Sequence, residues 1–289
     1  MNSRTADRIA TVFFWTVGLI SLGILLFIIL EIFGRGLLTA LKPSFLFGKP
    51  EAIKPGGGVL PMIVSSLYLV ALTLLIALPL SIGAAIYMAE FSKKGRIANF
   101  IRFCLDSLAT LPSIVFGLFG MTLFVVYFRW GFCLLAGAFT LALLNLPILL
   151  RSTEEAIKLV PQAYREASMS LGASRWTTIR QVVIPTAMPG ILTAMILPIG
   201  RIMGESAAII YTTGLFIRNI PLNPMSTAAP LAGYIWYAQS EAIVPDYRTI
   251  VNGGAALLLL MVLVVYFLAR YLGSRYQKKK LFGVGSGKT

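Results

Sequence analysis

The sequence lacks histidine altogether and has only two cysteines, Cys104 and Cys133, among its 289 residues. Without an imidazole, a histidine general base and a histidine-ligated metal are both excluded. The cysteines are expected near opposite ends of one helical hairpin, on the order of 35 Å apart at about 1.5 Å per residue, which is too far for a disulfide. The sequence therefore offers neither a disulfide framework nor a thiolate metal site.

Charge is also scarce. Charged residues make up only 12% of the chain and hydrophobic residues 57%, whereas a soluble domain carries roughly 25% charged residues. Six apolar blocks approach or exceed the length of about 20 residues that a helix needs to cross a hydrocarbon core of about 30 Å. We expect an all-α polytopic membrane protein of about six transmembrane helices, with residues 1–289 forming one domain. The blocks are Ile9–Phe33, Val59–Met88, Cys104–Phe128, Phe132–Leu150, Pro189–Thr213 and Ala255–Tyr271.

Acidic residues are few, because 11 Asp and Glu stand against 25 Lys and Arg, for a formal net charge of +14. The amino-terminal end, the second and fourth loops and the carboxyl-terminal end carry 17 of the Lys and Arg, and the three alternate loops carry 7. Short translocated loops avoid these residues. We therefore expect both termini in the cytoplasm. We also interpret the excess of basic residues as a sign of membrane topology rather than of nucleic-acid binding.

The last residues, Phe282-Gly-Val-Gly-Ser-Gly-Lys-Thr289, imitate a phosphate-binding P-loop. The pattern G-x-x-x-x-G-K-[ST] requires glycine where Phe282 stands, and it works only between a strand and a helix. We interpret residues 276–289 as a basic, disordered tail that binds no nucleotide. If ATP drives this protein, another chain binds it.

The loop from Arg151 to Pro185 is the most informative stretch. Pro161 and Gly172 flank a predicted short helix over Gln162–Leu171, and Ser174 can cap a second helix that Pro185 is expected to end. The loop is either an ordinary connection or a helical knob that inserts into a partner's groove. Outside the membrane on the other side, Ala228–Ala242 is expected to form a short interfacial helix.

Within this loop, Glu166-Ala167-Ser168, three residues, Gly172, nine residues and then Val182-x-Ile184-Pro185 resemble the EAA loop of bacterial ABC importer permeases, E-A-A-x3-G-x9-I-x-L-P. Ser168, Val182 and Ile184 are conservative departures from that pattern. The resemblance implies a cytoplasmic helical coupling loop, about residues 151–185, that docks on a separate ATPase. The residues to which it assigns this role are Glu166, Ala167, Ser168, Gly172, Ile184 and Pro185.

Three further stretches are similar to the permease pair of phosphate ABC importers: Leu111-Pro-Ser-Ile-Val-Phe-Gly-Leu-Phe-Gly120, Arg151-Ser-Thr-Glu-Glu-Ala156 and Arg201-Ile-Met-Gly-Glu-Ser206. The Thr-Glu-Glu-Ala stretch resembles the A-type subunit more than the C-type. The resemblance implies a multi-pass subunit of the bacterial inner membrane with no catalytic site and no cofactor of its own, since ATP and Mg would bind the ATPase. Its partners would be a second phosphate permease, a homodimeric ABC ATPase, an extracytoplasmic phosphate-binding protein and membrane lipid.

Arg201 is the candidate substrate residue. It lies 12 residues past Pro189, about 18 Å along a helix and thus near mid-bilayer, where arginine costs roughly 2.5–3.5 kcal/mol. Glu205 follows four residues later, on the same face of a continuous helix, and can pair with it. Either the two charges neutralise each other in a purely structural ion pair, or Arg201 lines an anion pathway in which Glu205 lowers the affinity of Arg201 for the anion.

The residues leave several functions open. Phosphate, phosphonate and other oxyanions present similar oxygens to one arginine, and the C-type subunit stays an alternative. A homomeric anion channel would leave the EAA-like loop without a partner. An intramembrane enzyme is disfavoured, because the sequence has neither histidine nor a serine or cysteine with an identifiable base.

Overall fold

A computed structural model describes residues 3–51, 56–92, 95–215, 219–241 and 245–282. Within these ranges the chain is helical and has no strand, which confirms the all-α polytopic fold. The helices are α1 (Ser3–Ala40), α2 (Pro43–Phe47), α3 (Leu60–Ile86), α4 (Arg96–Thr110), α5 (Ser113–Gly120), α6 (Leu134–Lys158), α7 (Gln162–Ser170), α8 (Arg175–Thr178), α9 (Ile184–Ala194), α10 (Ile196–Gly204), α11 (Ala207–Ile210), α12 (Leu231–Ser240) and α13 (Tyr247–Phe282). Three π-helical turns, η1 (Tyr87–Phe91), η2 (Met121–Tyr127) and η3 (Ile179–Val183), interrupt or end them.

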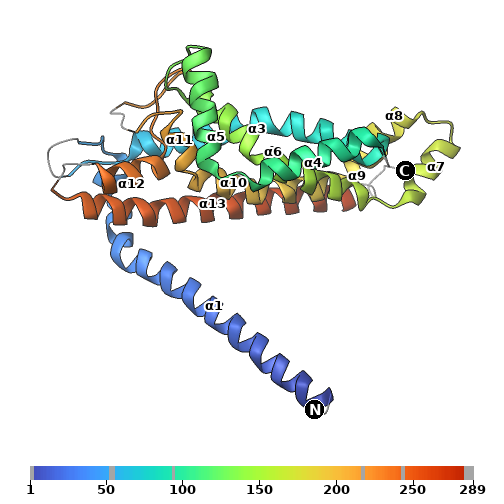
Figure 1. Cartoon of the computed structure of the whole chain (residues 1–289), viewed down its shortest axis with the longest axis horizontal. Helices are drawn as coiled ribbons and strands as arrows, with labels where there is room; N and C mark the ends of the chain where they lie inside the picture. The colour runs from blue at the N-terminus through green and yellow to red at the C-terminus, as the bar shows by residue number, and fades with distance from the viewer. Residues whose placement is uncertain (1–2, 52–55, 93–94, 216–218, 242–244, 283–289) are drawn as a thin grey trace.

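Five described helical segments are long and apolar enough to cross a membrane, and a bent pair makes a sixth. The long helices α3, α6 and α13 run along one axis, with α7 and α8 at one end of the bundle and α12 at the other (Figure 1). We call these the loop end and the α12 end. The carboxyl-terminal end of α13 lies at the loop end (Figure 1).

The predicted third span, Cys104–Phe128, is wrong as a single straight helix. Helices α4 and α5 meet at a bend of 100° between Thr110 and Ser113, and α5 stands across the bundle axis (Figure 1). Proline disfavours helical geometry in the residue before it and provides no N–H. Leu111 is accordingly extended, at φ −71° and ψ 136°, and Pro112, also non-helical, directly precedes the first residue of α5.

The predicted fifth span, Pro189–Thr213, has different ends. A nearly continuous helical rod runs from Arg175 through α9 and α10 to Gly204, so Pro185 does not end the preceding helix. The proline lies in the first turn of α9, where a missing N–H is tolerated. Beyond Gly204 the rod stops, and the short helix α11 follows after an extended residue.

Helix α1 leaves the bundle except at its carboxyl-terminal end (Figure 1). Its apolar side chains, including Trp15 at 69% and Phe27 at 67%, are exposed in the single chain. Gly36 is where α1 touches α13, because a Cβ there would lie 2.0 Å from the carbonyl oxygen of Asn252. A membrane-spanning helix of this kind is covered by lipid or another chain.

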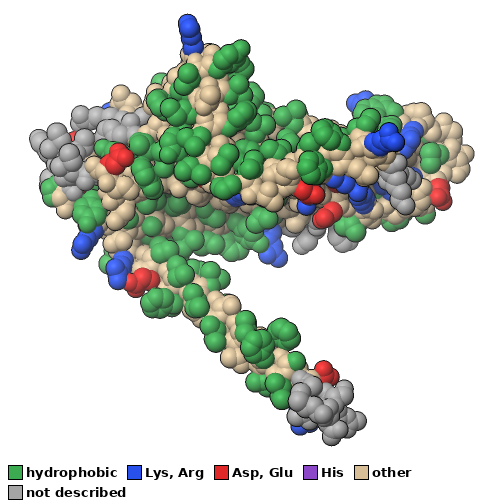
Figure 2. Space-filling view, viewed as in Figure 1, with side chains coloured by type: hydrophobic (Ala, Val, Ile, Leu, Met, Phe, Trp, Pro, Cys, Tyr) green, Lys and Arg blue, Asp and Glu red, His purple; other side chains and the backbone are tan. Residues whose placement is uncertain are grey.

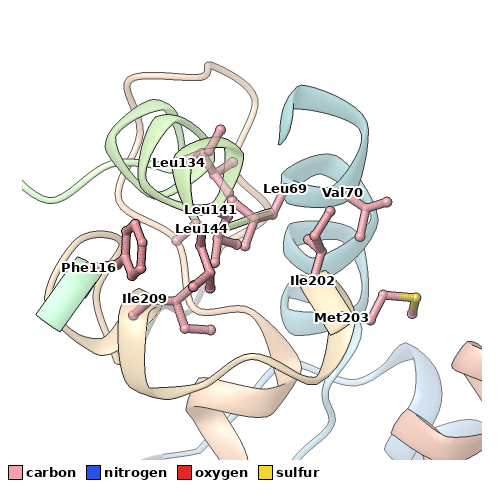
Figure 3. Packing of buried hydrophobic residues seen from close by; sticks show 12 residues of the cluster. Leu69, Val70, Phe116, Leu134, Leu141, Leu144, Ile202, Met203 and Ile209 are labelled. Carbon is pink, nitrogen blue, oxygen red and sulfur yellow. The ribbon is translucent and has the colours of Figure 1, made fainter. Parts of the chain in front are cut away.

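The bundle core lies between α3 and α6. Leu69 of α3 faces Leu134, Leu141 and Leu144 of α6 (Figure 3), and the same buried cluster includes Val70 of α3 with Ile202 and Met203 of α10. The face of the bundle seen in Figure 2 is also largely hydrophobic. A protein that is apolar inside and outside along one axis matches the membrane as its solvent.

Two smaller expectations have mixed outcomes. Within the stretch Ala228–Ala242 the structure has the helix α12, with shorter bounds, and Ala242 lies outside the described residues. The tail predicted to be disordered from residue 276 is instead helical to Phe282, as the end of α13. The remaining tail residues, 283–289, lie outside the described part of the chain.

Candidate coupling loop and anion pathway

Two short helices form the loop end, as the sequence predicts. Pro161 precedes α7, and the chain turns at Gly172, whose φ of +84° is left-handed and favours glycine. The Ser174 Oγ accepts a hydrogen bond from the backbone N–H of Thr177 over 3.2 Å and so caps α8. The turn chemistry read from single residues is therefore confirmed.

The EAA-like residues lie on two levels. Glu166, Ala167 and Gly172 are exposed at the tip, where the Leu171 side chain is 89% exposed. Ile184 and Pro185 are half-buried at the root, where α9 begins. Ser168 links the two loop helices, because its hydroxyl contacts the hydroxyl of Thr178 in α8 at 2.9 Å.

The tip also exposes large apolar side chains. Tyr164 is 51% exposed and Trp176 is 58% exposed, and none of the residues of α7 is buried. Several large apolar side chains exposed on one short loop favour a surface that a partner covers. The loop thus has the composition of a docking knob, as its resemblance to the EAA loop implies.

Sequence reasoning missed the contacts that hold this loop to the bundle. Glu90, in the π turn η1 at the end of α3, accepts hydrogen bonds from the Arg165 guanidinium at 2.7 and 3.0 Å. Arg175 of α8 donates to the Glu90 carbonyl, and its guanidinium lies 4.7 Å from the centroid of the Phe91 ring. No local sequence pattern indicates the Glu90–Arg165 pair, because the two residues are 75 positions apart.

A cavity of about 810 Å³ opens beside these contacts. It lies between the ends of α3 and α6 and the loop helices, with cationic side chains on its wall. Its lining residues are Ala89, Glu90, Lys158, Leu159, Val160, Pro161, Gln162, Arg165, Met169, Arg175, Thr178 and Ile179.

Arg201 and Glu205 do not form the predicted pair. Helix α10 ends at Gly204 and Glu205 is extended, at φ −73° and ψ 125°, so the same-face argument from a continuous helix fails. The Glu205 carboxylate instead accepts from the backbone N–H of Ala208 over 3.3 Å, and no ion pair joins it to Arg201. Because the rod begins at Arg175 rather than Pro189, Arg201 lies one turn from its end.

Arg201 nevertheless occupies a distinctive surface. Thr193, Leu197, Arg201 and Gly204 are all exposed, and their spacing of four, four and three residues places them on one helical face. We call them the Arg201 stripe. Two of the four residues are polar and one is glycine, whereas large apolar side chains predominate on the exposed surface of α1.

The α12 end has a polar cluster of its own. Asp246 accepts a hydrogen bond from the backbone N–H of Gly56 at 2.8 Å. Burial, with the nearby Tyr237 and Asp246, raises the pKa of Tyr234 to about 12, so its phenol is neutral at physiological pH. Across the described residues, no three His, Cys, Asp or Glu side chains gather in a way that could hold a metal ion.

The chain belongs to the family of inner membrane components of binding-protein-dependent transport systems, whose family model matches residues 77–278. It is therefore a multi-pass permease of an ABC transporter. A relative from Bacillus subtilis (strain 168), named a probable ABC transporter permease protein YqgI, is 39% identical over 96% of this chain and 99% of its own length.

Other relatives carry a more specific name, phosphate transport system permease protein PstA. The Haemophilus influenzae protein is 35% identical over 78% of this chain and 77% of its own length. The Yersinia pestis protein is 37% identical over 73% of this chain and 71% of its own length.

Solved structures share the fold at low identity. A bacterial ABC transporter involved in import of the acidic polysaccharide alginate matches with a TM-score of 0.64 at 18% identity, over 94% of this chain and 99% of that chain. The MetNI methionine ABC transporter in an inward-facing conformation matches with a TM-score of 0.56 at 18% identity, over 76% and 94%.

Proposed function

We propose that this chain is the A-type permease subunit of an ATP-driven phosphate importer. The observation that carries the proposal is the 35–37% identity to permeases named PstA over about three quarters of the chain. The relative that matches the whole chain is named only as an ABC permease. Another oxyanion is therefore the second candidate substrate.

The Arg201 stripe supports an anion as substrate. A guanidinium keeps its charge at all physiological pH values and presents planar donors that match the oxygens of phosphate. On the exposed face of a spanning rod, this charge is unfavourable in lipid unless water or a partner solvates it. In our proposal this face lines the pathway against a second, similar permease.

The coupling loop supports a separate energy source. The exposed knob of α7 and α8 docks on a homodimeric ATPase, which binds ATP and Mg, and this chain carries no catalytic site. An extracytoplasmic phosphate-binding protein delivers the anion at the α12 end. The loop end and both termini then face the cytoplasm, as the 17 to 7 distribution of Lys and Arg favours.

Radiolabelled phosphate uptake in a strain that lacks this chain tests the proposal. Restoring the chain should restore uptake, and arsenate should compete strongly because it matches the shape and charge of phosphate. If sulfate or a phosphonate competes better than arsenate, the second candidate replaces phosphate. If a detergent-purified chain never copurifies with an ATPase, the importer proposal itself fails.

A further inference from the structure

Glu90 receives both helices of the coupling loop. Its carboxylate binds Arg165 of α7, and its carbonyl oxygen binds Arg175 of α8. The same Arg165 guanidinium also donates to the carbonyl oxygens of Ile157, over 3.0 Å, and Val160. One side chain thus joins the end of α3, the end of α6 and α7.

The Glu90–Arg165 pair is withdrawn from water, unlike other ion pairs of the described chain. The side chains of Glu90 and Arg165 are 8% and 12% exposed. The corresponding values are 45% and 68% for Glu31 and Arg35 in α1. Removing either partner of such a pair is costly, because it leaves a largely buried charge without its counter-ion.

Helix α7 has little else to fix it in place. None of its residues is buried, so it has no apolar face packed on the bundle. Its described side-chain link to α8, the hydroxyl contact between Ser168 and Thr178, leads on to Arg175 and so to Glu90 again. Arg165 also reaches α6 through the Ile157 carbonyl, and Thr178 lies at the start of the rod that continues into α9. Among these described side-chain contacts, however, only those to Glu90 join the loop helices to the end of α3.

Helix α3 connects this point with the far end of the molecule. It packs along α6 for much of its length, and at its other end the buried Ser66 hydroxyl accepts a hydrogen bond from the backbone N–H of Leu231, over 2.8 Å. Leu231 is the first residue of α12. Helix α3 thus forms one packed path from η1 to the α12 end.

We infer that the Glu90–Arg165 ion pair is the positioning contact through which the coupling loop moves the membrane helices. This inference rests on the proposed docking of α7 on an ATPase. The contact holds α7 against η1, so that a shift imposed on α7 by nucleotide binding reaches α3 and, through Ser66, α12. Without the Glu90–Arg165 contact, α7 can move with the ATPase while α3 keeps its position.

The test uses the complete transporter in proteoliposomes, with ATP hydrolysis, phosphate uptake and the amount of copurified ATPase measured on the same preparation. Glu90→Gln keeps the side-chain volume, and Arg165→Met removes the charge. Both variants should retain the ATPase and its hydrolysis, whereas phosphate moved per ATP hydrolysed should fall on the order of tenfold. Arg165→Lys, which keeps the charge but not the forked donors, should lie between Arg165→Met and the unchanged protein.

The matched control is Arg35→Gln, which breaks an exposed Arg–Glu pair near the α12 end and should leave the transport ratio unchanged. Normal uptake per ATP in Glu90→Gln would overturn the inference, as would loss of ATPase association, since the pair would then shape the docking surface instead of transmitting motion. If Arg165→Met is absent from the membrane, Glu90→Gln and Arg165→Lys decide. The proposed function fails separately, if the unchanged protein neither binds an ATPase nor transports phosphate.

Discussion

Single residues explain both where the sequence succeeds and where it fails. Gly172 and Ser174 were predictable because turn and cap chemistry is local, set by one residue and its nearest neighbours. The Arg201–Glu205 pair was predicted wrongly, because the prediction assumed a continuous helix through both residues. The helix in fact ends at Gly204, between them. Glu90 escaped notice for a third reason, since its partners Arg165 and Arg175 are distant in sequence.

The first residue-scale prediction concerns the anion pathway. Arg201→Gln should abolish phosphate uptake while assembly with the partner subunits persists, because Gln carries no charge for the anion. Arg201→Lys should transport poorly, since a point charge cannot reproduce the forked donors. Uptake is measured at matched membrane levels, and the control is Arg35→Gln, which removes an exposed arginine outside the stripe and should leave uptake unchanged. Uptake at the unchanged rate in Arg201→Gln would remove Arg201 from the pathway.

Glu205 now has a separate prediction. Its carboxylate accepts the Ala208 N–H rather than neutralising Arg201, so Glu205→Gln keeps an acceptor oxygen at that position. We expect Glu205→Gln to transport at near-normal rates, and Glu205→Leu, which cannot accept, to impair transport. Equal and severe loss in both variants would show that the charge itself matters. The measurement is again uptake at matched membrane levels.

A third prediction tests the turn of the loop. Gly172 has a left-handed backbone, which costs a β-branched residue roughly 1–2 kcal/mol. Gly172→Val should remain in the membrane but bind less ATPase and take up less phosphate. Gly172→Asn, a residue that tolerates this conformation, is the control and should keep most of both. Full ATPase binding by Gly172→Val would contradict the docking role of the turn.

At the scale of elements, helix type was predictable and helix continuity was not. Apolar runs located all six crossing segments, and flanking Pro and Gly located α7. Two prolines were misjudged: Pro112 breaks its span into α4 and α5, whereas Pro185 lies within a continuing rod. A proline permits a break or a continuation, and tertiary packing decides between them.

The packing of α5 gives an element-scale prediction. A Cβ at Gly117 would lie 2.9 Å from the Cα of Ala208 in α11, and such a contact with backbone forces a shift. Gly117→Ala should therefore lower the unfolding temperature of the detergent-purified protein, at a cost of roughly 1–3 kcal/mol. The control is Gly83→Ala in α3, where nothing lies within 4 Å. It should be neutral or stabilising, because alanine favours helix, and an equal loss in both variants would contradict the close contact of α5 and α11.

At the scale of the whole molecule, the loop end and the α12 end have different chemistry. The loop end carries the docking knob and the Glu90 contacts, and the carboxyl-terminal end of α13 lies beside it (Figure 1). The charge count predicted this grouping, because alternate crossings bring every second loop to the same side. It does not reveal where α1 packs, since a lipid-facing helix is specified by hydrophobicity rather than by a partner surface.

The orientation of these two ends is testable with one matched pair of residues. Leu171 at the loop end and Leu222 near the α12 end are 89% and 90% exposed, so a cysteine at either position is accessible from its own side. The background is Cys104→Ala with Cys133→Ser, because the Cys133 sulfur accepts from the Ala136 N–H at the start of α6 and serine keeps an acceptor there.

In sealed right-side-out vesicles, a membrane-impermeant thiol reagent should label Leu222→Cys and spare Leu171→Cys. Inverted vesicles stripped of ATPase should give the reverse, since the loop end is then outside and uncovered. The physical reason is the retention of Lys and Arg, 17 against 7, on the cytoplasmic side. Labelling of Leu171→Cys in right-side-out vesicles would place the coupling loop on the outer side of the membrane, away from the ATPase. The docking role of α7 and the transmission through Glu90 would then both be wrong.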